Sequence, residues 1–392
     1  MADMAEFLVT LGSLLLLGLA TDAIGRRTAL PRISLLLLFG FLIGPSAFDL
    51  LPAYAGRWFP SIAEMALLII GFLLGGKLTL KFLHRHGRSV LYISVAEVLV
   101  TALVMMIGLL AIGVPFEMAL LLAGIAPATA PEADIVREIG ARGNFARTML
   151  GVMALDDVWT LIIFGFLLTA FGLHQGEGTG LQLLFAGVWE LGGAMLLGIV
   201  LGLPAAYLTG RIRPGEPTLS EAIGIVFLCG GIAFWLGFSY LLAVIILGGV
   251  IANFASHHIR PFHAIEGIEW PFLVLFFVLA GASFKPEVFG SVWLAGLAYI
   301  ILRAGGRLLG GWSGGRLSHA RPMIRRWMGV ALMPQAGVAT GLALIAANRF
   351  PDIGDQILAI VVVGTVIFEM AGPVLTRHAL RQAGTFGDKK PR

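Results

Sequence analysis

Long apolar runs separated by short polar loops extend along almost the whole chain. Many of these runs reach about 18 residues with few charges, which lets a helix cross a hydrocarbon core of ~30 Å. The pattern predicts an all-α polytopic membrane protein with about 13 transmembrane helices. The predicted spans are residues 5–24, 32–48, 62–79, 89–112, 117–139, 147–172, 181–210, 219–236, 239–255, 266–284, 287–313, 326–348 and 355–377.

The composition agrees with a lipid environment. Charged residues make up 13% of the 392 residues and the mean hydropathy is +0.92, whereas soluble domains contain about 25% charged residues. Residues 5–24 begin beside Asp3 and Glu6 and precede Arg26 and Arg27, so we interpret them as a retained helix and not a signal peptide. The isoelectric point near 9.5 does not indicate a nucleic-acid partner, because the basic residues gather in loops.

The basic residues lie mostly in every second loop. Of the 27 Lys and Arg residues, 22 lie in alternate loops and the C-terminal tail, and the opposite loops hold only Arg57, Lys285 and Arg349. Because positively charged loops stay in the cytoplasm, we expect the N-terminus outside and the C-terminus in the cytoplasm. Residues 381–392 then form a cytoplasmic tail that follows one transmembrane unit, residues 1–380.

Two pairs of spans resemble each other seven places apart. Span 3 contains "EMALLIIGFLLGG" (64–76) and span 10 contains "EWPFLVLFFVLAGA" (269–282), while span 5 contains "GIAPATAPEAD" (124–134) and span 12 "ALMPQAGVATG" (331–341). A displacement by an odd number of spans matches helices of opposite orientation. This is the inverted-repeat plan of secondary transporters.

Spans 5 and 12 are predicted to be interrupted helices. Pro127 and Pro131 remove backbone donors in span 5, and Pro334 and Gly337 interrupt span 12. Unwound backbone at membrane depth is tolerated only where it packs inside protein or lines a watery cavity. Ordinary proline kinks are the alternative, but the breaks occupy corresponding repeats, and Glu132 supplies a charge at the first one.

Two adjacent carboxylates, Asp156 and Asp157, lie near the middle of span 6. Ionisable groups at this depth are costly and are functional candidates. Neighbouring helix positions differ by about 100°, so we expect one carboxylate to face a watery cavity and the other to pair with an adjacent helix. A static ion-pair network that buries both is the alternative.

Span 11 carries Arg303 and Arg307 one turn apart, and the Asp pair is their obvious partner. Arg307 lies nearer the basic loop, so snorkelling toward the interface is an alternative for it. For Glu369 in span 13 and Gln335 in the span 12 break, we expect structural or gating roles rather than ion binding.

These residues resemble the monovalent cation:proton antiporter superfamily, in particular its NapA/Kef-type branch. The resemblance covers nearly the whole chain. Its markers are "LPRISLLLLFGFLIGPSAF" (30–48), "VREIGARGNFARTMLGVMALDDV" (136–158), "RAGGRLLGG" (303–311) and "ALMPQAGVATGLAL" (331–344), of which "ALDDV" is the most specific.

The resemblance implies a homodimeric antiporter of a bacterial inner membrane that exchanges Na⁺ or Li⁺ for H⁺ in pH homeostasis, without a cofactor. It implies a core domain (62–172 and 266–377) with two crossed broken helices, and a dimerisation domain (5–48 and 181–255). Asp157 would be the main ion-binding carboxylate and Asp156 would pair with span 11. Thr129 would offer an oxygen to the ion.

Two positions depart from the family pattern. Ala130 stands where the family often has Asp or Ser before the proline, and both span 11 cations are arginines where relatives often have a lysine. Alignment on the following "GGRL" favours Arg303 as the equivalent of that lysine, and which arginine pairs with Asp156 stays open. A buried lysine can release a proton, whereas arginine stays charged, so we expect a different stoichiometry or pH dependence.

Three alternatives remain beside Na⁺/H⁺ exchange. K⁺/H⁺ exchange is the nearest, because Kef-type relatives share most markers. A membrane-embedded enzyme is disfavoured, since Asp157 is followed by "VWTLI" without the further acid of a magnesium site, and "DIGDQ" (352–356) lacks the first glycine of an intramembrane aspartyl protease motif. A bile-acid-type symporter shares the crossed-helix plan but not these markers.

Overall fold

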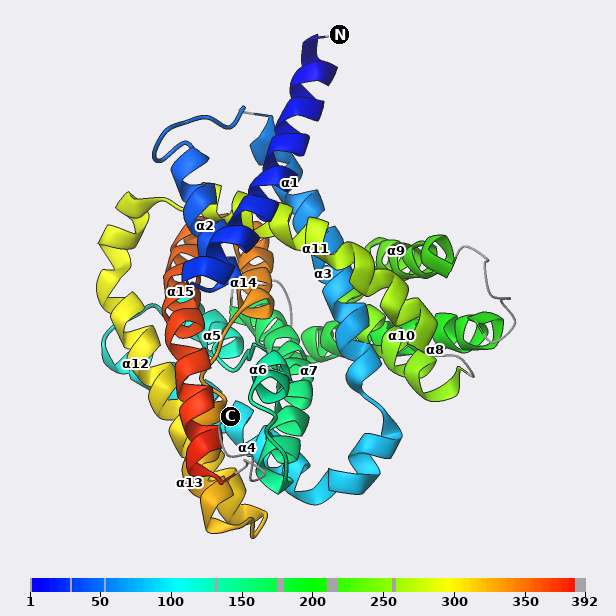
Figure 1. Ribbon diagram of the computed structural model, residues 1–392, viewed down its shortest axis with the longest axis vertical. Helices are drawn as coiled ribbons and strands as arrows, with labels where there is room; N and C mark the ends of the chain where they lie inside the picture. Colours follow the sequence, from blue (N-terminus) through cyan, green and yellow to red (C-terminus); the bar gives the residue numbers. More distant parts are fainter. Residues whose placement is uncertain are drawn as a thin grey trace.

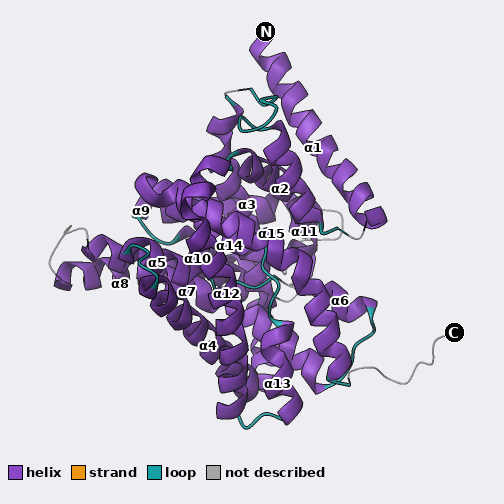
Figure 2. Ribbon diagram, turned by 90° about the vertical axis from the view of Figure 1, so that its left-hand side faces the viewer, coloured by secondary structure: helices purple, strands orange, loops and turns teal. Residues whose placement is uncertain are grey.

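A computed structural model describes residues 2–28, 30–52, 54–130, 133–174, 180–209, 218–255 and 259–384, and these residues form helices without any strand. The two ends of the bundle are marked by α1 and by α13 in both views (Figures 1 and 2). The helices are α1 (Ala2–Thr28), α2 (Arg32–Ile43), α3 (Ala55–Lys77), α4 (Leu80–Ala111), α5 (Phe116–Ile125), α6 (Ala133–Glu138), α7 (Asn144–His174), α8 (Gly180–Thr209), α9 (Thr218–Leu236), α10 (Tyr240–Phe254), α11 (Ile259–Ala282), α12 (Pro286–Leu317), α13 (Pro322–Ala331), α14 (Gly337–Arg349) and α15 (Pro351–Gln382).

The helices lie where the apolar runs predicted them. Spans 5 and 12 are each divided in two, as α5 with α6 and as α13 with α14, and every other span corresponds to one helix. Within the described ranges, eight helices are long and apolar enough to cross a membrane, and four further apolar segments are shorter, at residues 32–43, 60–76, 116–125 and 240–254. The positions of the helices are therefore confirmed, while the count of 13 spans stays a prediction.

A row of glycines lets α12 approach α4 closely. A Cβ atom added at Gly306, Gly310 or Gly314 would collide with the backbone of α4, at Thr101, Glu97 and Ile93 respectively. Small residues at such spacing allow two membrane helices to pack backbone against backbone. This contact places Arg307, on the same helix as the glycines, beside Glu97.

Two more glycine contacts join other pairs of helices. Gly40 of α2 lies against the backbone of Val278 in α11, and Gly75 of α3 lies against the backbone of Ile245 in α10. Both contacts join helices that the predicted division puts into different domains. The boundary between a core and a dimerisation domain thus stays a prediction, and close packing of α2 with α11 and of α3 with α10 does not favour it at these helices.

Candidate ion-binding site

The two interrupted helices meet at their breaks. Residues 126–130 follow the end of α5, residues 332–336 follow the end of α13, and neither segment is helical. The backbone N–H of Ala130 donates to the carbonyl of Pro334 at 3.1 Å. The negative ends of the α5 and α13 dipoles therefore point into one buried region, where they favour a cation.

Arg303 provides one such cation and is fully buried. Its guanidinium lies 4.2 Å from the centre of the Phe368 ring. Its N–H groups donate to four backbone carbonyls, two from each break, at 2.7–3.3 Å: those of Ala126, Ala128, Met333 and Pro334. These carbonyls lack helical partners, so Arg303 satisfies them and holds the two breaks together.

Arg307 is the arginine that pairs with Asp156. Its Nη1 lies 3.1 Å from Asp156 Oδ2 and 2.7 Å from Glu97 Oε1. Its Nη2 donates to Thr129 Oγ1 at 2.8 Å and also to the carbonyls of Pro127 and Ala128. The sequence left open which arginine pairs with Asp156, and in this structure it is Arg307. Arg307 does not snorkel toward the interface, because it is fully buried.

The adjacent carboxylates of α7 face different surroundings, as their offset of about 100° predicts. Asp156 is fully buried, and its Oδ2 accepts a hydrogen bond from Thr129 Oγ1 at 3.0 Å besides facing Arg307. Asp157 is also buried, at 1% exposed, but it lines a cavity of about 140 Å³, which we call the Asp157 cavity. A long contact of 3.4 Å joins the Thr129 N–H to Asp157 Oδ1.

Glu97 in α4 is the site residue for which the sequence suggested no role. It is fully buried, accepts from Thr101 Oγ1 at 3.1 Å, and shares the Nη1 nitrogen of Arg307 with Asp156. Two signals were available: a carboxylate within an apolar run, and the glycine spacing of α12 that predicts a close helix contact.

The described buried site contains three carboxyl groups and two guanidinium groups. Two carboxylate oxygens, Glu97 Oε2 and Asp156 Oδ1, are buried without a hydrogen-bond partner among the described residues. A buried acceptor left in this way is costly, and a proton or cation would relieve that cost.

Three other predicted residues lie outside this cluster or outside the described ranges. Gln335 Nε2 donates to the Tyr299 hydroxyl at 2.8 Å, next to the second break. Glu369 Oε2 accepts from Ser34 Oγ at 2.6 Å, which joins α15 to α2. Glu132 lies outside the described residues.

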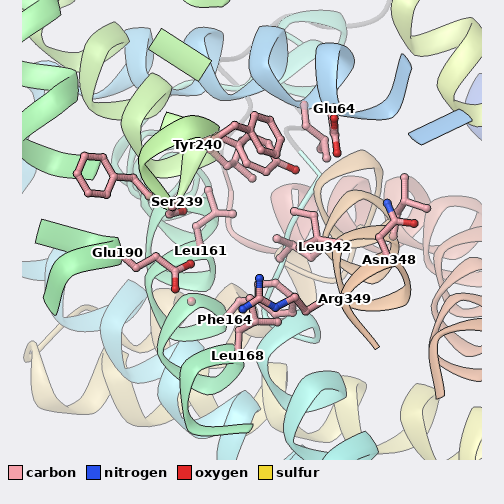
Figure 3. A pocket seen from close by; sticks show the side chains of 18 residues that line it. Glu64, Leu161, Phe164, Leu168, Glu190, Ser239, Tyr240, Leu342, Asn348 and Arg349 are labelled. Atoms are coloured by element: carbon pink, nitrogen blue, oxygen red, sulfur yellow. The ribbon is translucent and has the colours of Figure 1, made fainter. Parts of the chain in front are cut away.

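A second and larger cavity lies between α3, α7, α8, α9, α10 and α14. It measures about 440 Å³, has an apolar floor, and its polar lining includes Glu64, Glu190, Tyr240 and Arg349. We call it the Glu64 cavity. Figure 3 shows Glu64 and Tyr240 on one side of it, and Glu190 with Arg349 on the opposite side.

Known proteins resemble this chain over almost its whole length. An ammonium/H⁺ antiporter subunit, AmhT of Alkalihalophilus pseudofirmus, is 24% identical over 391 residues, which cover 96% of each chain. The solved structure of the sodium proton antiporter MjNhaP1 from Methanocaldococcus jannaschii at pH 8 superposes with a TM-score of 0.81 at 20% identity, covering 98% of this chain and 100% of that one. A second structure of MjNhaP1, from electron microscopy, gives a TM-score of 0.74 at 22% identity, covering 99% and 100%.

At these identities, the structural matches establish the fold alone. The family resemblance read from the motifs is confirmed independently, because the transmembrane sodium/hydrogen exchanger family matches residues 11–381. That match includes both breaks, the Asp pair and both buried arginines. The chain therefore belongs to the sodium/hydrogen exchanger family and is a membrane-embedded cation/proton antiporter.

Proposed function

We propose that this protein exchanges Na⁺ or Li⁺ for H⁺ by alternating access, with cation and proton competing for the carboxylate of Asp157. One observation carries the proposal: Asp157 lines a cavity, while its neighbour Asp156 is held by Arg307 and Thr129. A ligand that enters this cavity reaches Asp157, whereas Asp156 could take a ligand only if its ion pair with Arg307 were broken. Hard oxygen ligands suit an alkali ion.

Asp156 and Thr129 complete the binding site in this proposal. Thr129 stands at the first break and also lines the Asp157 cavity. Its carbonyl oxygen is a candidate ligand for the ion, and its hydroxyl could serve only by exchanging its present bonds to Asp156 and Arg307. Asp156 keeps Arg307 in place and contributes negative charge. The cation would bind in the Asp157 cavity, next to the point where the two breaks meet, and we propose that the two interrupted helices cross at that point.

The charges support exchange of one cation for one proton. Glu97, Asp156 and Asp157 carry three negative charges when ionised, and Arg303 and Arg307 carry two positive charges that are not lost. The site therefore has one uncompensated negative charge, which either one alkali ion or one proton neutralises. Such a one-for-one exchange moves no net charge across the membrane.

We assign sides from the distribution of basic loops. The Asp157 cavity is lined by Ile33 and Glu269, in the parts of α2 and α11 that follow basic loops, so it would open toward the cytoplasm. The Glu64 cavity is lined by Gly237 and Arg349, at loops poor in basic residues, and would face outside. In this orientation the N-terminus lies outside a bacterial inner membrane, and we propose that two protomers form a homodimer.

Ammonium is a second candidate substrate, because the curated relative is an ammonium/H⁺ antiporter subunit. K⁺ remains the alternative that the Kef-type motifs suggest. The same oxygen ligands can bind any of these monovalent cations. Selectivity therefore has to be measured.

The test is cation-induced dequenching of a pH dye in everted membrane vesicles, comparing Na⁺, Li⁺, K⁺ and NH₄⁺. Proton movement is expected with Na⁺ and Li⁺ and is expected to be lost in Asp157→Asn. Full activity in that variant would refute the assignment of Asp157, and a response to K⁺ or NH₄⁺ alone would replace the proposed substrate.

A further inference from the structure

Each of the two cavities is lined by a carboxylate that belongs to the internal repeat and that the ion-binding site does not use. Glu64 of α3 lines the Glu64 cavity and Glu269 of α11 lines the Asp157 cavity. Both side chains are half-buried. Charged groups in the membrane-spanning part of a helix are costly and are functional candidates, so the positions of these two in cavities require an explanation.

The internal repeat relates these two residues. Glu64 is the first residue of "EMALLIIGFLLGG" and Glu269 is the first residue of "EWPFLVLFFVLAGA", the segments that correspond in the two halves of the chain. Because the halves have opposite orientations, matched positions lie toward opposite faces of the membrane. One carboxylate is thus expected on each side of the site, and each one lines a different cavity.

A layer of leucines separates the two cavities. Leu67, Leu161 and Leu342 line the Glu64 cavity, and each lies about one helical turn from a residue that lines the Asp157 cavity: Ile70, Asp157 and Val338. All three leucines are at most 7% exposed. In this conformation Asp157 therefore shares a cavity with Glu269 and is separated from Glu64 by apolar side chains.

We propose that Glu64 and Glu269 are symmetry-related waiting sites for the transported cation, Glu269 on the cytoplasmic side and Glu64 on the outer side. The proposal rests on the proposed cation/proton exchange at Asp157. Each carboxylate holds a hydrated cation in its own cavity and raises the local cation concentration next to Asp157. When the leucine layer opens and the cytoplasmic side closes, the cation would pass between Asp157 and Glu64 instead of between Asp157 and Glu269.

The charges around Glu64 are consistent with this role. Tyr240 lies on its side of the Glu64 cavity, while Arg349 lies across the cavity with Glu190 (Figure 3). The positive charge therefore lies near another carboxylate and not beside Glu64. Glu269 shares its cavity with Asp157 and otherwise mostly apolar side chains, so a cation between the two carboxylates would be attracted by both.

The proposal predicts sided effects on cation affinity. A negative charge close to the path of a cation is strong enough to change its binding constant by about fivefold. Glu269→Gln is expected to raise the half-saturating Na⁺ concentration about fivefold at the cytoplasmic face and to leave the outer value unchanged. Glu64→Gln is expected to raise the half-saturating Na⁺ concentration about fivefold at the outer face and to leave the cytoplasmic value unchanged.

The measurement uses the full-length protein in everted and right-side-out vesicles, with Na⁺ added to the exposed face and proton movement followed by a pH dye. Glu266→Gln and Glu287→Gln are matched controls, because both residues are exposed carboxylates, the first on α11 and the second at the start of α12. Neither is expected to change the half-saturating concentration. Glu269→Asp and Glu64→Asp keep the charge and are expected to stay within twofold of the wild type.

The ratio of the cytoplasmic to the outer half-saturating concentration decides the outcome. A ratio that rises in Glu269→Gln and falls in Glu64→Gln supports the proposal. An unchanged ratio in folded, transporting Gln variants overturns the proposal. A change in the Asp variants as large as the change in the Gln variants also overturns it, because the effect would then come from the shape of the side chain and not from its charge. If the wild type moves no protons, or Asp157→Asn remains active, the proposed function itself fails, and this result is visible before either glutamate is changed.

Discussion

Arg303 is predicted to be the main element that stabilises the meeting point of the two interrupted helices. Its guanidinium donates to four backbone carbonyls, two from each break. Hydrogen bonds between membrane helices contribute about 0.6 kcal/mol each on average and about 1.7 kcal/mol at most. The four together therefore contribute about 2–7 kcal/mol, and Arg303→Met, which keeps much of the volume, should lower the free energy of unfolding by that amount.

The free energy of unfolding is measured by titrating the purified protein in mixed micelles with dodecyl sulfate and following its fluorescence. Arg303→Lys keeps the charge but has donors on a single nitrogen, which cannot reach four separated carbonyls, so about half of the loss should remain. Arg316→Met, on the same helix but exposed and placed over the Trp312 ring, is the control and should cost less than about 1 kcal/mol. A free energy of unfolding in Arg303→Met equal to that of Arg316→Met would refute the reasoning.

Three further predictions concern the charges and the packing of the site. Glu97→Gln removes one of the three negative charges and so leaves the site without a net negative charge. The half-saturating Na⁺ concentration should therefore rise at least about tenfold in vesicles, and an unchanged value would contradict the charge count. Gly310→Leu should separate α12 from α4 and abolish transport. Gly305→Leu is the control and should fold and transport normally, because a Cβ added at Gly305 meets nothing within 4 Å. Equal transport by the two variants would argue against the close contact between α12 and α4. An imposed membrane potential should leave the rate of the wild type in proteoliposomes unchanged, and a rate that follows the potential would rule out one-for-one exchange.

The helices and the breaks were predictable because apolar length and proline each have a local physical consequence. A run of about 20 apolar residues has few other stable states in a membrane, and Pro127 and Pro334 interrupt a helix wherever it lies. The different surroundings of Asp156 and Asp157 were also predictable, because adjacent residues on a helix point about 100° apart.

The identity of the charge partners was not predictable in the same way. Arg303 and Arg307 lie one turn apart on one face, so only the depth at which α12 packs decides which of them reaches Asp156. That depth depends on the glycine contacts with α4, which are a property of two helices together. Glu97 was missed for this reason, since its partner lies on a helix more than 200 residues away in sequence. The cavities likewise arise from several helices and have no signal in any one of them.

Competition between cation and proton at Asp157 is the central claim, and the pH dependence of cation affinity tests it most directly. The measurement is the initial rate of radioactive Na⁺ uptake into proteoliposomes with equal pH on both sides, as a function of Na⁺ concentration. With the carboxylate mostly protonated, each fall of one pH unit should raise the half-saturating Na⁺ concentration about tenfold and leave the maximal rate unchanged, because the two ligands exclude each other by mass action. A half-saturating concentration that is independent of pH, with only the maximal rate changing, would contradict the account.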